Sequence, residues 1–137
     1  MNIDPTLWGP SVWRSLHYIT LGYPDTPTER HVRSARDLFT SLGSLLPCEK
    51  CRTNFVSHLA THPLSDAVLS TRQTLVRWLI DFHNDVNRSI GKPIMSYDEA
   101  LRMYPLRASD WWDLRVVTIV ILVLLIIIMI VVMRYMR

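Results

Sequence analysis

The sequence contains only two cysteines in 137 residues, so it cannot form the disulfide framework of a small secreted domain. A formal net charge of +3 is also too small to indicate a nucleic-acid-binding protein. Residues 1–5 lack the basic and apolar regions of a signal peptide. No strand-period pattern of any length and no internal repeat is present. We therefore expect a helical protein whose N-terminal domain lies on the cytosolic side of any membrane it meets.

One long hydrophobic run stands near the C-terminus. Residues Val116–Met133 form a stretch of eighteen in which only Thr118 is not strongly apolar. As a helix this stretch would be about 27 Å long, close to the hydrocarbon thickness of a bilayer. Trp111 and Trp112 precede it, and basic residues follow it, as at the edges of membrane spans. A small domain cannot bury a helix that is apolar on every face, so we predict a single transmembrane helix rather than a core helix.

The remaining sequence has helical periodicity. The predicted helices run from about Pro10, in a first turn, to Leu21, from Thr28 to Leu46, from Pro47 to His62, and from Thr71 to Ile90. Gly91 is expected just after the fourth helix, and a capping box at Ser96–Glu99 begins a short fifth helix that ends near Tyr104. The predicted fold class is all-α: a four-helix bundle with a short fifth helix in residues 1–106, a linker at 107–115, the transmembrane helix at 116–133 and a basic tail at 134–137.

The two cysteines stand in Pro47-Cys48-Glu49-Lys50-Cys51. If Pro47 begins a helix, Cys48 lies in its first turn, where the helix dipole and free N–H groups stabilise a thiolate. The first cysteine of such a pair is expected to be the more exposed one and the one attacked by substrate. Two alternatives remain open: a zinc site with His58 and His62, and two inert buried thiols. The gap of six residues between Cys51 and His58 is short for a zinc finger.

A second group of polar residues lies near the end of the fourth helix. His83, Val86 and Asn87 fall on one helical face, and Asn84 and Asn87 are poor helix formers. This combination indicates the polar edge of a ligand site, although a fraying helix end is an alternative.

Four segments together resemble the Erv/ALR family of FAD-dependent sulfhydryl oxidases. They are Trp8-Gly9-x3-Trp13-x3-His17, Tyr23-Pro24-Asp25-x-Pro27, Pro47-Cys48-Glu49-Lys50-Cys51, and His83-Asn84-x-Val86-Asn87 followed by Gly91-Lys92-Pro93. They occur in the family's order and near its spacing, and they extend over about residues 6–105.

The resemblance implies a four-helix bundle with FAD at its mouth. Cys48 is implied to be the interchange cysteine attacked by a substrate dithiol, and Cys51 the flavin-proximal cysteine that passes electrons to FAD. Oxygen is implied to reoxidise the flavin and give hydrogen peroxide. The residues implied to contact FAD are Gly9, Trp13, His17, Cys51, His83, Asn84, Val86, Asn87, Lys92 and Tyr104.

The sequence departs from many relatives in two respects. Ala60 and Ile80 stand near the positions of a structural disulfide between the third and fourth helices, and no cysteine pair is available to act as a shuttle. This cysteine-poor form looks like those of large DNA viruses. The implied partners are a protein dithiol (thioredoxin-like or a viral structural protein), oxygen, a membrane and a second copy of the chain in a homodimer; no metal and no nucleic acid are expected. A catalytically silent, tail-anchored helical adaptor is the alternative function, and a zinc module is a weaker one.

Overall fold

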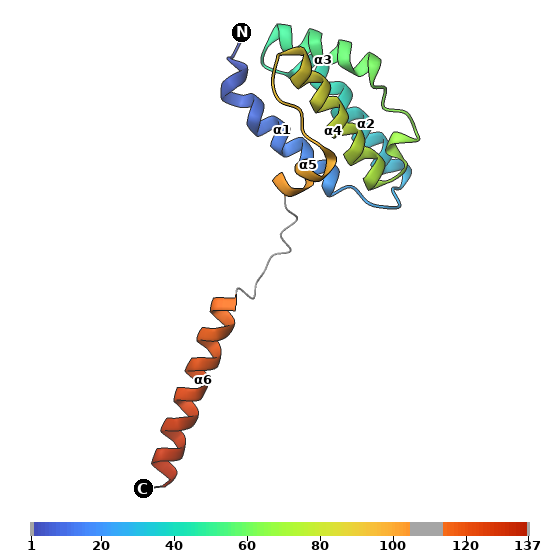
Figure 1. Ribbon diagram of the computed structural model, residues 1–137. Coiled ribbons are helices and arrows are strands. Elements are labelled where there is room, and N and C mark those ends of the chain that lie inside the picture. The colour runs from blue at the N-terminus through green and yellow to red at the C-terminus, as the bar shows by residue number, and fades with distance from the viewer. Residues whose placement is uncertain (1, 105–113, 137) are drawn as a thin grey trace. The chain divides into compact units, whose positions relative to one another are not determined.

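A computed structural model describes residues 2–104 and 114–136, and every regular element in these ranges is a helix. The elements are α1 (Pro5–Leu21), α2 (Glu29–Leu45), α3 (Glu49–Thr61), the 3-10 turn η1 (Val68–Ser70), α4 (Arg72–Ser89), α5 (Tyr97–Met103) and α6 (Leu114–Tyr135) (Figure 1). The predicted all-α fold class is confirmed. The chain divides into two compact units, Met1–Pro105 and Leu106–Arg137.

The first helix begins earlier than the sequence analysis predicted. The Asp4 carboxylate accepts a hydrogen bond from the Thr6 N–H at 2.9 Å, and Pro5 occupies the first helical turn. Pro10 therefore lies inside α1. The prediction that Pro10 marks the helix start was wrong, because Asp4-Pro5 is the stronger start signal: an N-cap residue followed by a proline whose missing N–H costs nothing there.

The predicted end of α4 and the predicted start of α5 are confirmed. Gly91 follows the cap of α4 with a φ of 70°, a conformation that glycine adopts without strain. The Ser96 N–H donates to Glu99 Oε2 at 2.8 Å, and the Glu99 N–H donates to Ser96 Oγ at 3.3 Å. These reciprocal bonds form the capping box that begins α5.

Helix α4 is central to the bundle, since it packs against α1, α3 and α5 as well as η1. Its side chains Leu75, Leu79 and Phe82 are almost completely buried. Phe82 makes ring contacts with Trp13 of α1 and Phe55 of α3. The helix that carries the predicted ligand edge is thus held in place by the helix that follows the cysteine pair and by α1.

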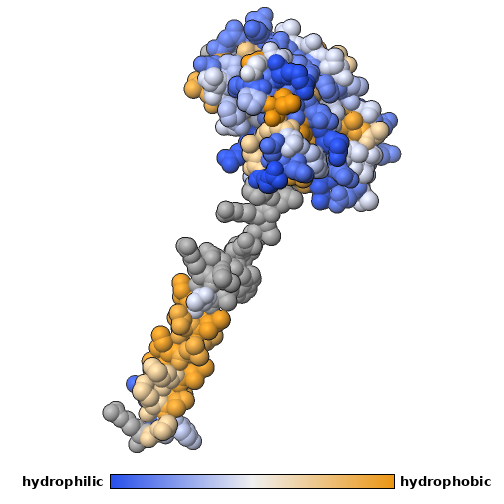
Figure 2. Space-filling model, in the orientation of Figure 1, coloured by the Kyte–Doolittle hydropathy of each residue, from blue (hydrophilic) through white to orange (hydrophobic). Residues whose placement is uncertain are grey.

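Helix α6 belongs to the second unit and is apolar on all described sides (Figure 2). Its residues Thr118–Tyr135 form a stretch long and apolar enough to cross a membrane, and none of this stretch is buried within the protein. At 1.5 Å per residue the 22-residue helix is about 33 Å long. Trp111 and Trp112, expected at the membrane edge, lie outside the described residues.

Candidate active site

The cysteine pair lies at the start of α3. Cys48 and Cys51 form a disulfide, with their Cα atoms 5.1 Å apart. Cys48 is the N-cap residue in an extended conformation, and the Cys51 N–H donates to its Sγ at 3.2 Å. The prediction that Cys48 lies in the first helical turn was wrong by one position, because the sulfur itself caps the helix. This geometry directs a helix-terminal N–H at the sulfur, which favours its thiolate form after reduction.

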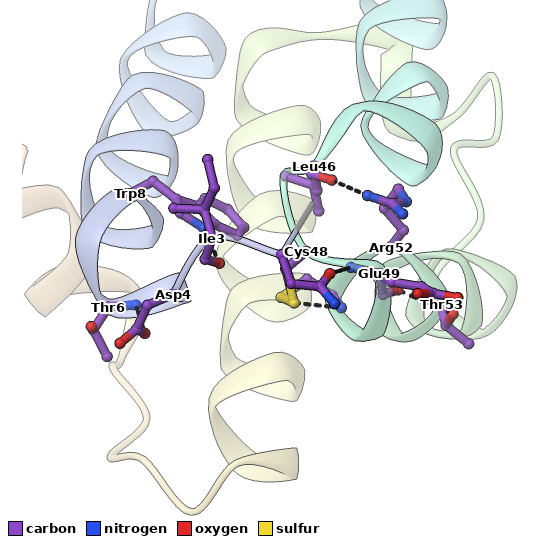
Figure 3. Close-up of a disulfide and its surroundings, with 11 residues drawn as sticks. Ile3, Asp4, Thr6, Trp8, Leu46, Cys48, Glu49, Arg52 and Thr53 are labelled. Carbon is purple, nitrogen blue, oxygen red and sulfur yellow. Dashed lines mark hydrogen bonds between the residues drawn. A yellow bond between two sulfur atoms is a disulfide. The ribbon is translucent and has the colours of Figure 1, made fainter.

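The expected difference in exposure between the two cysteines is reversed. Cys48 is only 9% exposed. Cys51 is half-buried and packs against the hydrophobic core. The N-terminal residues bond to both neighbours of Cys48: the Ile3 N–H donates to the Pro47 carbonyl at 2.9 Å, and the Glu49 N–H donates to Asn2 Oδ1 at 2.9 Å. Figure 3 shows Ile3 near Cys48. Because these contacts join residues 44 and 47 positions apart, local sequence patterns gave no sign of them.

Four of the predicted cofactor residues meet in one cluster of rings. The indole of Trp13 stacks on the imidazole of His83, with ring centroids 3.9 Å apart. His17 stacks on Tyr104 at 4.3 Å, and its Nε2 lies 3.0 Å from His83 Nδ1. The cluster joins α1, α4 and the end of α5, so it confirms that segments distant in sequence come together here.

Both histidines of this cluster are buried. Burial, with a smaller contribution from the charge of His83, lowers the pKa of His17 to about 4. Burial likewise lowers the pKa of His83 to about 4, with a contribution from the charge of Lys92. Both rings are therefore neutral at pH 7, and each offers one N–H donor and one nitrogen acceptor.

The asparagines of α4 have different surroundings. The Asn84 side chain donates to the Met95 carbonyl at 2.7 Å and accepts from the Met95 N–H at 2.9 Å. The Lys92 N–H donates to the Asn87 carbonyl at 2.8 Å. Asn84 thus fastens the loop that carries Lys92 to α4. Asn87 is 9% exposed; its side-chain amide makes no hydrogen bond to a described residue, and its polar atoms are not fully buried.

The two remaining residues predicted to contact the cofactor, Val86 and Gly9, make no described contact with the ring cluster. Val86 is half-buried and packs on the core. Gly9 lies one turn before Trp13 in α1, and a side-chain carbon built there would meet nothing within 4 Å. No described contact joins Gly9 to the ring cluster.

Sequence reasoning missed a polar brace between α3 and α4. His58 Nδ1 lies 2.7 Å from Asp85 Oδ2, His62 Nδ1 lies 3.8 Å from the same oxygen, and Arg88 contacts Asp85 Oδ1 at 2.9 Å. The two histidines considered as zinc ligands therefore face a carboxylate, while both cysteines are in the disulfide. A histidine and an aspartate on different helices give no sequence periodicity that would pair them.

Comparison with known proteins identifies this arrangement. The Erv1/Alr family model matches residues 10–105. A probable FAD-linked sulfhydryl oxidase of Acanthamoeba polyphaga mimivirus is 44% identical over 99 residues, which cover 72% of this chain and 69% of that protein. The FAD-linked sulfhydryl oxidase of African swine fever virus (isolate Tick/Malawi/Lil 20-1/1983) is 33% identical over 97 residues, covering 71% of this chain and 79% of the viral protein.

Solved structures agree on the fold. The FAD-binding domain of Erv1 from Saccharomyces cerevisiae superposes with a TM-score of 0.68 at 24% identity, and the match covers 82% of this chain and all of that domain. Because the family model matches residues 10–105 and the mimivirus relative is 44% identical over more than two thirds of both proteins, the chain belongs to the Erv1/Alr family.

Proposed function

We propose that this protein is an FAD-dependent thiol oxidase that forms disulfide bonds in partner proteins and transfers the electrons to oxygen. The observation that carries this function is the Cys48–Cys51 disulfide at the start of α3, in the same bundle as the ring cluster of Trp13, His17, His83 and Tyr104. The family membership and the names of the viral relatives support it.

Thiol exchange at the cysteine pair proceeds in two steps. A substrate thiolate attacks Cys48 Sγ, which forms a mixed disulfide and releases Cys51 as a thiolate. A second substrate thiolate attacks the substrate sulfur of that mixed disulfide and releases Cys48. The substrate has then lost two electrons and two protons, and the cysteine pair has gained the two electrons. The Cys51 N–H, which already donates to Cys48 Sγ, stabilises the leaving charge on Cys48.

The described residues fit FAD. Stacked rings offer flat apolar surfaces, the two neutral imidazoles offer donors and acceptors, and the amide of Asn87 makes no hydrogen bond to a described residue and remains available to a ligand. When bound, FAD accepts an electron pair and passes it to oxygen, which becomes hydrogen peroxide.

Individual residues are proposed to have separate roles toward FAD. Trp13, His17, His83 and Tyr104 would contact its rings, and Asn87 would hydrogen-bond to it. Asn84 acts by fastening the loop of Lys92, since its own amide is used by Met95. Cys51 is proposed to face the cofactor because it packs inward, toward the core.

The test uses the full-length protein purified in detergent. We expect a yellow protein with a flavin absorption spectrum that consumes oxygen when dithiothreitol is added, and a Cys51→Ser variant that keeps the colour but loses oxygen consumption. A folded, colourless protein that takes up no FAD would instead support the adaptor alternative.

The identity of the thiol donor, the membrane location and the homodimer are also proposals. Protein thiols and oxygen are the substrates. The proposed thiol donors are thioredoxin-like or viral structural proteins, which a Cys51→Ser variant would trap as mixed disulfides on Cys48.

Helix α6 is proposed to anchor the protein in a membrane with the catalytic unit on the cytosolic side, as protease accessibility would show. Exposed apolar side chains on α1, Leu7 and Ile19 among them, are proposed to form a homodimer interface, to be tested by light scattering.

A further inference from the structure

Residues 2–4 form a short N-terminal arm that lies against the turn before α3. The Ile3 N–H bonds to the carbonyl of Pro47, and Asn2 Oδ1 accepts the N–H of Glu49. These two bonds fall on the residues immediately before and after Cys48. The arm therefore follows the backbone of the residue that substrate must attack.

A third bond fixes the other end of the arm. Trp8 Nε1–H donates to the Ile3 carbonyl at 3.2 Å, and the Trp8 ring packs on the hydrophobic core. Figure 3 shows Ile3 lying between Trp8 and Cys48. The arm is thus tied to α1 on one side and to the cysteine turn on the other.

The arm is well placed to cover Cys48 yet weakly held. Cys48 is 9% exposed, whereas Ile3 is 42% exposed and Asn2 is exposed too. No arm side chain is buried in the core, so three hydrogen bonds near solvent are the main described contacts that hold it. Segments held in this way open locally far more often than the protein unfolds.

Attack on a disulfide requires the incoming thiolate to reach the sulfur along the S–S axis. Building on the proposed thiol-oxidase function, we infer that the N-terminal arm is a cover over Cys48, and that its opening limits the access of thiols to that sulfur. Asn2 and Trp8 hold the arm closed and are positioning residues for the exchange reaction.

The test measures the reactivity of the sulfur itself. Full-length protein in detergent is reduced, kept free of oxygen and treated with iodoacetamide, and alkylation of each cysteine is followed by peptide mass spectrometry over a range of pH. The variants are Asn2→Ala, which removes the acceptor for Glu49, and Trp8→Phe, which removes the donor to Ile3 and keeps an aromatic ring. Ser57→Ala, on the exposed face of α3, is the matched control.

We expect the limiting rate constant of the Cys48 thiolate at high pH to rise roughly three- to tenfold in each arm variant, as for the loss of one net hydrogen bond holding a closed state. The rate at Cys51 and the rates in Ser57→Ala should not change. Reduction of the oxidised disulfide by dithiothreitol should accelerate by the same factor.

An unchanged or lower limiting rate at Cys48 in folded arm variants would overturn the inference. A change confined to the apparent pKa of the thiol would overturn it as well, because the arm would then act on charge and not on access. Alkylation requires neither FAD nor oxygen, so the result can be interpreted even if the chain fails the flavin test of the proposed function.

Discussion

Replacing His17 and His83 by glutamine should make the folded bundle less sensitive to acid. The two imidazoles are buried and share one hydrogen bond of 3.0 Å between Nε2 of His17 and Nδ1 of His83. A neutral pair satisfies that bond with one donor and one acceptor, whereas a doubly protonated pair has two donors and no acceptor. Glutamine keeps an amide donor and acceptor at each position and does not titrate.

The sign of the effect follows from the pKa values. In the unfolded chain both histidines titrate near 6.5, and in the folded protein burial lowers the pKa of each to about 4. Between pH 6.5 and 4 the unfolded state therefore binds more protons, and the free energy of unfolding decreases as the pH falls. One pKa unit corresponds to about 1.4 kcal/mol, so a single histidine contributes about 3 kcal/mol over this range. Because a proton on one ring disfavours a proton on the other, the two rings titrate as a pair, and the pair contributes at least as much as one histidine alone.

The assay is urea denaturation of residues 1–105 without FAD at several pH values from 7 to 4, for the original sequence and the double glutamine variant. The difference between their pH dependences isolates the pair, since all other titrating groups are common to both. We expect the original sequence to lose at least about 3 kcal/mol more than the variant between pH 7 and 4, the contribution of one histidine. Parallel pH profiles would refute the reasoning, because they would mean that the two rings accept protons in the folded bundle without cost.

Three further perturbations test other parts of the molecule. A side-chain carbon at Gly43 would lie 2.8 Å from Val56 Cγ2, so Gly43→Ala should destabilise the bundle by about 1 kcal/mol in urea denaturation, as a crowding cost outweighs the helix propensity of alanine. In a Val56→Ala background the same change should stabilise by about 1 kcal/mol, and destabilisation there would refute the packing argument. Asp85→Asn should cost about 1 kcal/mol at pH 7, since it weakens the bond to His58 at a partly exposed site. The bond to His58 lowers the pKa of Asp85, so the cost should begin to decrease as the pH falls below about 4 and vanish once the folded carboxyl is protonated; a cost that does not decrease with falling pH would contradict it. Removal of residues 106–137 should release the protein from the membrane fraction of cells, and continued membrane binding would show that α6 is not the anchor.

Local signals predicted most of the helices correctly. The capping box at Ser96, the glycine after α4 and the apolar stripes each depend on residues within one or two turns, and such signals are readable in sequence. The start of α1 was misplaced because Pro10 also satisfies the rule for a first turn. The structure shows that the earlier Asp4-Pro5 pair takes that role.

The residues of the candidate site could be predicted from the sequence, but most of their contacts could not. The family resemblance named the ring residues, and the structure brings Trp13, His17, His83 and Tyr104 together. The hydrogen bonds of the N-terminal arm to the cysteine turn and the brace between His58 and Asp85 are contacts between distant segments. Neither leaves a period or a spacing in the sequence, so physical reasoning on local patterns could not find them.

The central claim is that electrons from a substrate dithiol reach FAD through Cys48 and Cys51. The most direct measurement is the flavin absorption of the full-length protein, loaded with FAD and free of oxygen, as dithiothreitol is added. We predict that the absorption of oxidised flavin disappears in the original sequence and persists in Cys51→Ser and Cys48→Ser variants that retain FAD. Equal loss of absorption at equal rates in these variants would contradict the account, because the thiol would then reduce the flavin without the cysteine pair.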